Sequence, residues 1–234
     1  MLVQMEIGQQ SLMLQIDKKI TSDDLSILIF QDRIVFCTLK QTLYFNLEKN
    51  INSDSLGTWI KYHNIKKNNT KCISFESNGV IIPEKLYDEA NKNLYLSLTD
   101  DDLNNKKIQT KIIESNNQVF IFPQNRDWDL LFQSLGVDIK TTHFAAELIS
   151  FLSKLANTSL KKSIFIHLRK NFFDVFIYQG SQLLLFNSFP HQDEEEFLYY
   201  LFFVLEQFYL KANQFEAIFL GKFLNYQRYY DAFK

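Results

Sequence analysis

The order of predicted secondary-structure elements repeats along the chain, and this repeat constrains the fold more than any other feature. Each copy begins with three short runs rich in β-branched and aromatic residues, which are typical of strands, and continues with a helix, a strand and a second helix. The first copy comprises predicted strands at Leu25–Phe30, Arg33–Leu39, Thr42–Leu47 and Lys71–Phe75 and predicted helices at Asp54–Lys67 and Pro83–Asn93. The second comprises predicted strands at Ser163–Leu168, Phe172–Tyr178, Gln182–Phe189 and Phe215–Leu220 and predicted helices at Asp193–Lys211 and Tyr226–Phe233. Because the side chains of the two copies do not match closely, the repeat is one of topology rather than of sequence.

The stretch between the two copies does not follow the repeat. Ile108–Glu114 and Gln118–Pro123 predict a β-hairpin, and residues 125–157 predict a helix, a strand and a further helix. We therefore divide the chain into an N-terminal lobe, residues 1–158, which includes an inserted segment at about 99–158, and a C-terminal lobe, residues 159–234. The predicted fold class is α/β, with two βββαβα lobes and an inserted α/β segment.

Two βββαβα units in one chain resemble the actin-like ATPases, a superfamily with ribonuclease H-like lobes, and more distantly their pilus-assembly members. Several runs are more closely similar to an uncharacterised bacterial family, domain of unknown function 3822, to which an actin-like ATPase fold is assigned. They are Val80-Ile-Ile-Pro83 with Leu86-Tyr87, the lone His143, Leu183-Leu-Leu-Phe-Asn-Ser-Phe-Pro190, Glu195-Glu-Phe-Leu-Tyr-Tyr200 and Glu206-Gln207. The resemblance covers about residues 25–234 and implies the fold. It implies no activity, because the function of that family is unknown.

The loops that bind nucleotide in actin-like ATPases are altered here. In that superfamily the second-lobe loop typically reads Asp-x-Gly-Gly-x-Thr-x-Asp, and it falls on residues 167–174 of this chain, where only Asp174 matches. His167 stands at the metal-binding acid, Arg169 and Lys170 stand at the two glycines, and a Phe stands at the Thr. The first-lobe hairpin, around Asp32, has no glycine. The adenosine-contacting Gly-Gly of the second lobe is reduced to Gly221.

Asp32, Arg169, Lys170, Asp174 and Gly221 are therefore the candidate cofactor-binding positions, as remnants of phosphate and adenosine loops. Arg169 and Lys170 could hold a phosphate by charge alone, but exposed hairpin tips also favour such residues. We expect Asp174 to accept hydrogen bonds from backbone or turn N–H groups. His167 alternates with apolar neighbours in a strand, which favours a hydrogen-bonded histidine in the core or between the lobes over a metal ligand.

Composition excludes several classes of function. The formal net charge is -2, and the short lysine groups lie between predicted elements, which argues against a nucleic-acid partner. No pair of histidines has a zinc-ligand spacing, and we find no nucleophile–base motif that would define a catalytic residue. Cys37 and Cys72 lie in apolar runs, as buried free thiols in a reducing compartment do. The longest apolar run, Phe197–Leu205, is too short for a membrane span and no signal peptide is evident, so we expect a cytoplasmic protein.

The long helix of the second copy has apolar residues on more than one side. Phe197, Leu201 and Leu205 form a broad apolar face, while Tyr199, Phe203 and Leu210 fall on the other side. Either another part of the chain covers this second side, or it contacts a protein partner or a second copy.

These observations lead to three hypotheses. The first is a non-enzymatic interaction or scaffold protein with a degenerate nucleotide site and no cofactor. The second is a nucleotide-binding protein or weak ATPase that uses unconventional loops between the lobes, with ATP and Mg²⁺. The third, a nucleic-acid-processing enzyme, needs clustered carboxylates that the first-lobe strands Leu25–Phe30 and Arg33–Leu39 lack. We also expect the hairpin tips at Asp32 and Lys170 to face a common cleft, because two actin-like lobes place equivalent hairpins opposite each other.

Overall fold

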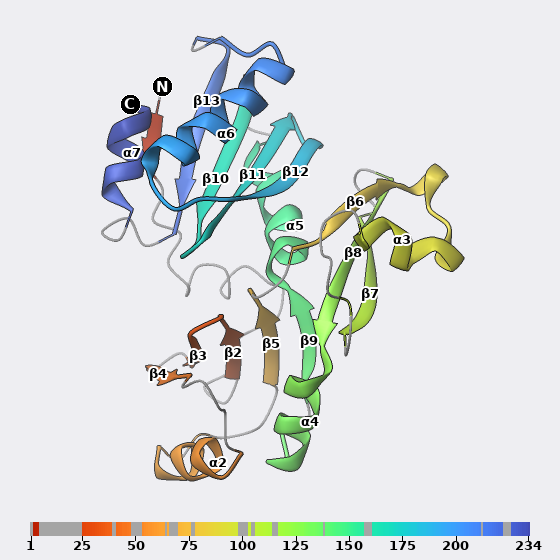
Figure 1. Cartoon of the computed structure of the whole chain (residues 1–234), viewed down its shortest axis with the longest axis vertical. Coiled ribbons are helices and arrows are strands. Elements are labelled where there is room, and N and C mark those ends of the chain that lie inside the picture. Colours follow the sequence, from red (N-terminus) through yellow and green to blue (C-terminus); the bar gives the residue numbers. More distant parts are fainter. Residues whose placement is uncertain are drawn as a thin grey trace.

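The computed structural model shows two large sheets, a smaller third sheet and the helices that cover them (Figure 1). It describes residues 2–4, 25–38, 41–47, 53–63, 65, 70–75, 78–97, 103, 106–113, 117–137, 139–156, 161–211, 213–221 and 226–234.

The first large sheet has the strand order β4-β3-β2-β5-β9. Its strands are β2 (Leu25–Ile29), β3 (Arg33–Cys37), β4 (Thr42–Asn46), β5 (Thr70–Ser74) and β9 (Lys140–His143). The first three are antiparallel, and β5 and β9 extend the sheet in parallel. Helices α2 (Ser53–Tyr62) and α4 (Arg126–Ser134) pack Leu56, Ile60 and Phe132 against one face of this sheet.

The second large sheet repeats this arrangement, with the order β1-β13-β10-β11-β12. Its strands are β1 (Leu2–Gln4), β10 (Lys162–Leu168), β11 (Phe172–Gln179), β12 (Gln182–Pro190) and β13 (Phe215–Leu220). The strands β10, β11 and β12 are antiparallel, and β13 and β1 extend the sheet in parallel. The predicted pair of sheets, each with three antiparallel strands extended by parallel ones, is confirmed. The fifth strand, β1, was not predicted.

A third, three-stranded sheet has the order β6-β8-β7, from β6 (Val80–Pro83), β7 (Lys106–Ile113) and β8 (Gln118–Asn125). The predicted hairpin is β7 and β8. The predicted helix from Pro83 to about Asn93 is wrong, because Val80–Pro83 pairs with β8 as a strand. Two 3₁₀ turns, Glu84–Leu86 and Glu89–Asn91, and helix α3 (Lys92–Ser97) follow it.

The residues assigned to the inserted segment, about 99–158, are divided between two of these sheets. The strands β7 and β8 lie in the third sheet, whereas β9 pairs with β5 in the first large sheet. Residues 99–102 lie outside the described part of the chain. The lobe boundaries at 158 and 159 themselves stay a prediction.

Helix α5 (Phe144–Ala156) lies between the two large sheets (Figure 1). Its buried side chains, Phe144, Leu148 and Leu152 among them, belong to one continuous core with residues of all three sheets. These partners include Leu28 and Val35 of the first sheet, Phe165 and Phe176 of the second, and Phe120 and Phe122 of the third. Separating the lobes would therefore expose a large apolar surface to water.

A partly buried carboxylate fixes the third sheet to the first lobe. Glu147 of α5 accepts hydrogen bonds from Lys71 at 2.7 Å, from Lys111 at 3.0 Å and from Thr142 at 3.1 Å. Burial alone would raise the pKa of Glu147, but the bonds and charges of the two lysines outweigh burial and lower this pKa. Strands β5, β7 and β9 are thereby connected through one side chain.

The opposite face of the second large sheet is covered by α6 (Glu194–Gln207) and α7 (Gln227–Phe233). Phe197, Leu201 and Leu205 of α6 are buried against this sheet. Cys37 and Cys72 are buried free thiols, as predicted. Within the described residues, no helix combines the length and apolar character that a membrane crossing requires.

Candidate functional site

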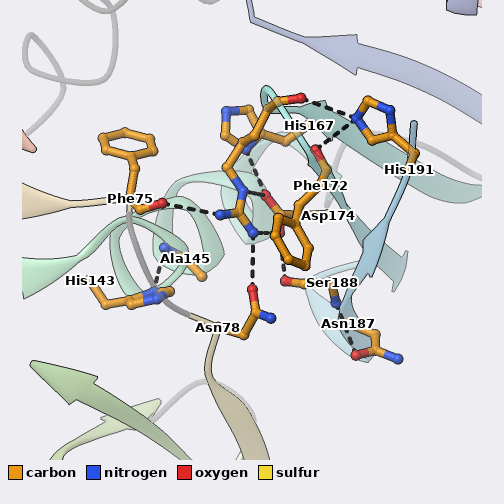
Figure 2. Close-up of polar contacts among 11 residues, drawn as sticks. Phe75, Asn78, His143, Ala145, His167, Phe172, Asp174, Asn187, Ser188 and His191 are labelled. Carbon is orange, nitrogen blue, oxygen red and sulfur yellow. Dashed lines mark hydrogen bonds and ion pairs between the residues drawn. The ribbon is translucent and has the colours of Figure 1, made fainter. Parts of the chain in front are cut away.

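Three strands of the second large sheet place polar side chains side by side on one face. His167 of β10 is opposite Asp174 of β11, and Asp174 is opposite Ser188 of β12. Residues that are opposite one another on neighbouring strands share a face, so these side chains converge (Figure 2). Arg169, two residues beyond His167 at the end of β10, reaches the same group.

The Asp174 carboxylate is fully buried, and both of its oxygens are bonded by side chains of this chain. Arg169 donates from Nε to Oδ2 at 2.9 Å and from Nη2 to Oδ1 at 2.8 Å, as a bidentate pair. His167 Nδ1 donates to Oδ2 at 2.9 Å, and Ser188 Oγ donates to Oδ1 at 2.6 Å. Our expectation that Asp174 accepts from backbone or turn N–H groups is therefore wrong: its partners are side chains.

The charge balance of this group follows from its burial. Burial alone would raise the pKa of the Asp174 carboxyl, because it disfavours the ionised form. The charge of Arg169 and the hydrogen bond from His167 outweigh that effect and hold the pKa well below its usual range. Asp174 is therefore a carboxylate at neutral pH, with Arg169 as its counter-charge.

Arg169 also connects the two lobes. Its Nη1 donates to the backbone oxygen of Phe75, which directly follows β5, at 3.1 Å, and its Nη2 donates to Oδ1 of Asn78 at 3.2 Å (Figure 2). The guanidinium lies over the rings of Phe144, at 4.9 Å, and Phe172, at 5.3 Å. Every nitrogen of the guanidinium is thus bonded. The expectation of an exposed Arg169 at a hairpin tip is wrong, because the first lobe covers it.

His167 lies between the lobes as well. Its ring is 5.4 Å from the Phe144 ring and 6.1 Å from the Phe75 ring, both on the first-lobe side. The predicted hydrogen-bonded histidine of the core or of the contact between lobes is confirmed by these contacts and by its bond to Asp174.

A buried histidine fixes the backbone of the same hairpin. His191 Nε2 lies 3.1 Å from the Arg169 carbonyl oxygen and 3.2 Å from that of Phe172, so this nitrogen carries the proton. His191 Nδ1 is 3.1 Å from the Tyr229 hydroxyl on α7. The position of Arg169 is therefore supported from the first lobe and from the C-terminal helix.

The two hairpin tips face each other, as the repeat predicted. Lys170 Nζ of the second tip lies 3.6 Å from Asp32 Oδ2 of the first tip, and both side chains are exposed to solvent. Each tip is a tight turn, closed by bonds from Phe30 N to Arg33 O and from Arg169 N to Phe172 O. No residue of either turn has a positive φ.

Gly221 lies at the end of β13 with a φ of +114°. A Cβ atom at this position would have the Leu168 carbonyl oxygen as its nearest neighbour, at 3.7 Å, so there is space for a side chain but not a suitable backbone conformation. Gly221 is thus beside the end of β10, close to the residues that surround Asp174.

The sequence did not identify Asn78, Ser188 or the Phe75 carbonyl as parts of this group. One signal was available: Asp174 interrupts the apolar run Phe172–Tyr178, and a charge in a buried strand requires a buried counter-charge. Arg169 is the nearest arginine, across the hairpin turn. Among the described residues, no three His, Cys, Asp or Glu side chains are grouped so that they could hold a metal ion.

Comparisons with known proteins identify the fold. A family model described as "Protein of unknown function (DUF3822)" matches residues 5–234. A Bacteroides thetaiotaomicron protein with an actin-like ATPase fold and unknown function superimposes with a TM-score of 0.77 at 18% identity, covering 91% of this chain and 88% of that chain. This chain therefore has the actin-like ATPase fold.

Two further structures are similar at lower scores. The PilM–PilN type IV pilus biogenesis complex gives a TM-score of 0.48 at 10% identity, covering 90% of this chain and 71% of that chain. The cytoplasmic domain of EpsL, an inner-membrane component of the Vibrio cholerae type II secretion system, gives 0.39 at 8% identity, covering 85% and 82%. No curated protein sequence matches the chain.

Proposed function

The chain belongs to the family described as "Protein of unknown function (DUF3822)", and we propose that it is a non-enzymatic interaction or scaffold protein whose nucleotide site is degenerate. One observation carries this proposal. The acid that matches the phosphate-loop motif, Asp174, already has its charge and all its hydrogen bonds satisfied by His167, Arg169 and Ser188.

The residues present do not fit a nucleotide with its metal ion. To bind a metal, Asp174 would have to release Arg169 and leave a buried guanidinium without its counter-charge. Breaking a buried ion pair in this way costs about 3–5 kcal/mol. Because each factor of ten in affinity corresponds to about 1.4 kcal/mol, this cost would weaken the binding of a nucleotide with its metal ion by roughly two to four orders of magnitude.

The hairpin tips also argue against a phosphate cradle. Successive backbone N–H groups converge on an anion when right- and left-handed residues alternate, which requires a positive φ. Both turns lack one, and Arg169 N is already bonded to Phe172 O within its turn. We propose that the contact between the lobes through Arg169, which bonds Phe75 and Asn78, replaces nucleotide binding in this chain. We also propose a cytoplasmic location, which the two buried free thiols support.

Isothermal titration calorimetry with ATP and Mg²⁺ tests the proposal, with folding of every variant checked by circular dichroism. We expect no saturable binding by the wild-type protein below about 1 mM ATP. A dissociation constant near 1 μM that is lost in Asp174→Ala would contradict the proposal.

Lys170→Ala is the matched control, because it removes charge from the exposed tip without touching the buried group. Binding that persists without Mg²⁺, weakens with added salt and is lost in Lys170→Ala would favour the second hypothesis in a reduced form, an anion site held by charge alone.

A further inference from the structure

Helix α6 presents a row of exposed aromatic side chains to solvent. Tyr199, Phe202 and Phe203 are 67%, 52% and 50% exposed, and Glu195 and Glu206 lie at the two ends of the same row. The spacing of these five residues, i, i+4, i+7, i+8 and i+11, places them on one side of the helix. We call these five residues the α6 outer face. Of the candidate interaction residues, Tyr199 and Phe203 lie on it, whereas Leu210 is half-buried below the helix end.

The end of α6 carries a second unusual aromatic residue. Tyr209 N bonds to Glu206 O and Leu210 N bonds to Leu205 O, which is the pattern of a Schellman C-cap. The residue at this position needs a positive φ and is usually glycine. Here it is Tyr209, with a φ of 51° and 89% of its surface exposed. Stability does not explain an exposed tyrosine in a backbone conformation that glycine adopts more readily.

The charges on this surface indicate what it can bind. Helix α6 contains no Lys or Arg, and Lys211 follows only after the helix has ended. Arg228 of α7 pairs with Glu194, whereas Glu195 and Glu206 form no ion pair with any residue in the described part of the chain. The α6 outer face is thus apolar at its centre and negative at both ends. The two carboxylates are roughly 16 Å apart along the helix axis, from a rise of 1.5 Å per residue.

A second copy of this chain does not complement that surface. Two α6 outer faces packed antiparallel would bring Glu195 of one copy toward Glu206 of the other, and parallel packing would bring identical glutamates together. An anionic lipid surface would meet the same repulsion. A partner helix with an apolar stripe and Lys or Arg at both ends fits the charges and the apolar row together.

We propose that the α6 outer face, extended by Tyr209, is the docking site for an amphipathic helix of a partner protein that carries cationic residues on either side of its apolar stripe. This inference rests on the proposed role as an interaction protein and names the partner class for that role. It does not depend on whether the nucleotide site binds ATP, so the calorimetry and the peptide experiment can fail separately.

The test uses two synthetic peptides of about 18 residues, each with leucines at helical spacing. One has lysines at both ends of its apolar stripe, and the other has glutamates at the same positions. Fluorescence anisotropy without nucleotide measures their binding to the full chain. We expect the lysine peptide to bind at least about tenfold more tightly than the glutamate peptide, because only its charges complement Glu195 and Glu206.

Three variants sharpen the test. The double change Glu195→Lys and Glu206→Lys should reverse the preference between the peptides, which a nonspecific apolar surface would not do. Phe203→Ser should weaken binding of the lysine peptide by about tenfold or more, since this change removes an exposed contact and no core packing. Tyr209→Gly should weaken binding while the melting temperature stays equal or rises, because glycine relieves the positive φ.

The proposal is overturned if neither peptide binds, if the wild-type protein does not distinguish them, or if the charge reversal leaves their order unchanged. It is also overturned if sedimentation shows a dimer that Phe203→Ser dissociates, which would identify a second copy as the occupant. Binding to vesicles of anionic lipid that Phe203→Ser abolishes would equally overturn it.

Discussion

The buried pair between Arg169 and Asp174 allows a quantitative prediction about stability. Arg169→Met keeps most of the side-chain volume between the Phe144 and Phe172 rings but removes the charge. Asp174 is then a fully buried carboxylate without a counter-charge, which costs about 3–5 kcal/mol in the free energy of unfolding. For a protein of 234 residues each kcal/mol lowers the melting temperature by about 2–4 °C, so we expect a decrease of roughly 6–20 °C.

The assay is urea unfolding followed by circular dichroism at neutral pH, applied to a double-mutant cycle. Arg169→Met, Asp174→Asn and the double variant are compared with the wild-type protein. The double variant should be destabilised by less than the sum of the two single variants, with a coupling of about 0.5–3 kcal/mol, because each single change leaves the other partner unpaired. Lys170→Ala is the control: its ion pair with Asp32 spans 3.6 Å and Lys170 is 68% exposed, so it should change stability by less than about 1 kcal/mol.

Two results would refute this reasoning. The first is an Arg169→Met variant that loses no more stability than Lys170→Ala, which would mean that Asp174 is solvated or neutral in the folded protein. Additive single effects would mean that the two side chains do not depend on each other, contrary to the bidentate geometry.

Two further predictions concern acid and backbone strain. The folded-state pKa values of Asp174 and Glu147 are both lowered, so the stabilisation by these two carboxylates is complete above their unfolded-state pKa values of about 4. This stabilisation is lost as the pH falls below those values, and measurements of the unfolding free energy against pH should show the loss. A flat profile between about pH 5 and pH 2 would contradict the prediction. Gly221→Ala should destabilise the protein by about 1–3 kcal/mol, although no atom blocks the Cβ, because a φ of +114° is unfavourable for alanine; unchanged urea unfolding would contradict it.

The arrangement of the two large sheets could be predicted from the sequence because the strands are short, apolar and separated by clear turns. Both hairpins were predicted within a few residues, and the facing of their tips is confirmed by the contact between Lys170 and Asp32. Strand β1 was missed because three residues, Leu2–Gln4, are too few to show a period, and the strand exists through its pairing with β13. Pro83 was interpreted as a helix start, but it ends a β-branched run that pairs with β8.

The candidate site was predicted less well than the fold, because its chemistry depends on contacts between distant parts of the chain. Asp174 and Arg169 were identified as loop positions, but their burial depends on Phe75 and Asn78, which are more than 90 residues away in the chain. Helical spacing likewise shows that Tyr199 lies opposite the core face of α6, but not whether another element covers it. The structure answers that question: Tyr199 is 67% exposed.

The contacts between the lobes connect the proposed degenerate nucleotide site with the proposed docking site on α6. Helix α5 and the three sheets share one core, and Arg169 adds a buried ionic contact between the lobes at the hairpin. The contacts between the lobes are already formed by the chain's own side chains, so the proposed scaffold role requires no ligand to close them. Under the proposed function, recognition then uses surfaces that the interior leaves exposed. The α6 outer face is on the side of the second sheet opposite α5, so a partner helix could bind there without disturbing either the shared core or the pair between Arg169 and Asp174.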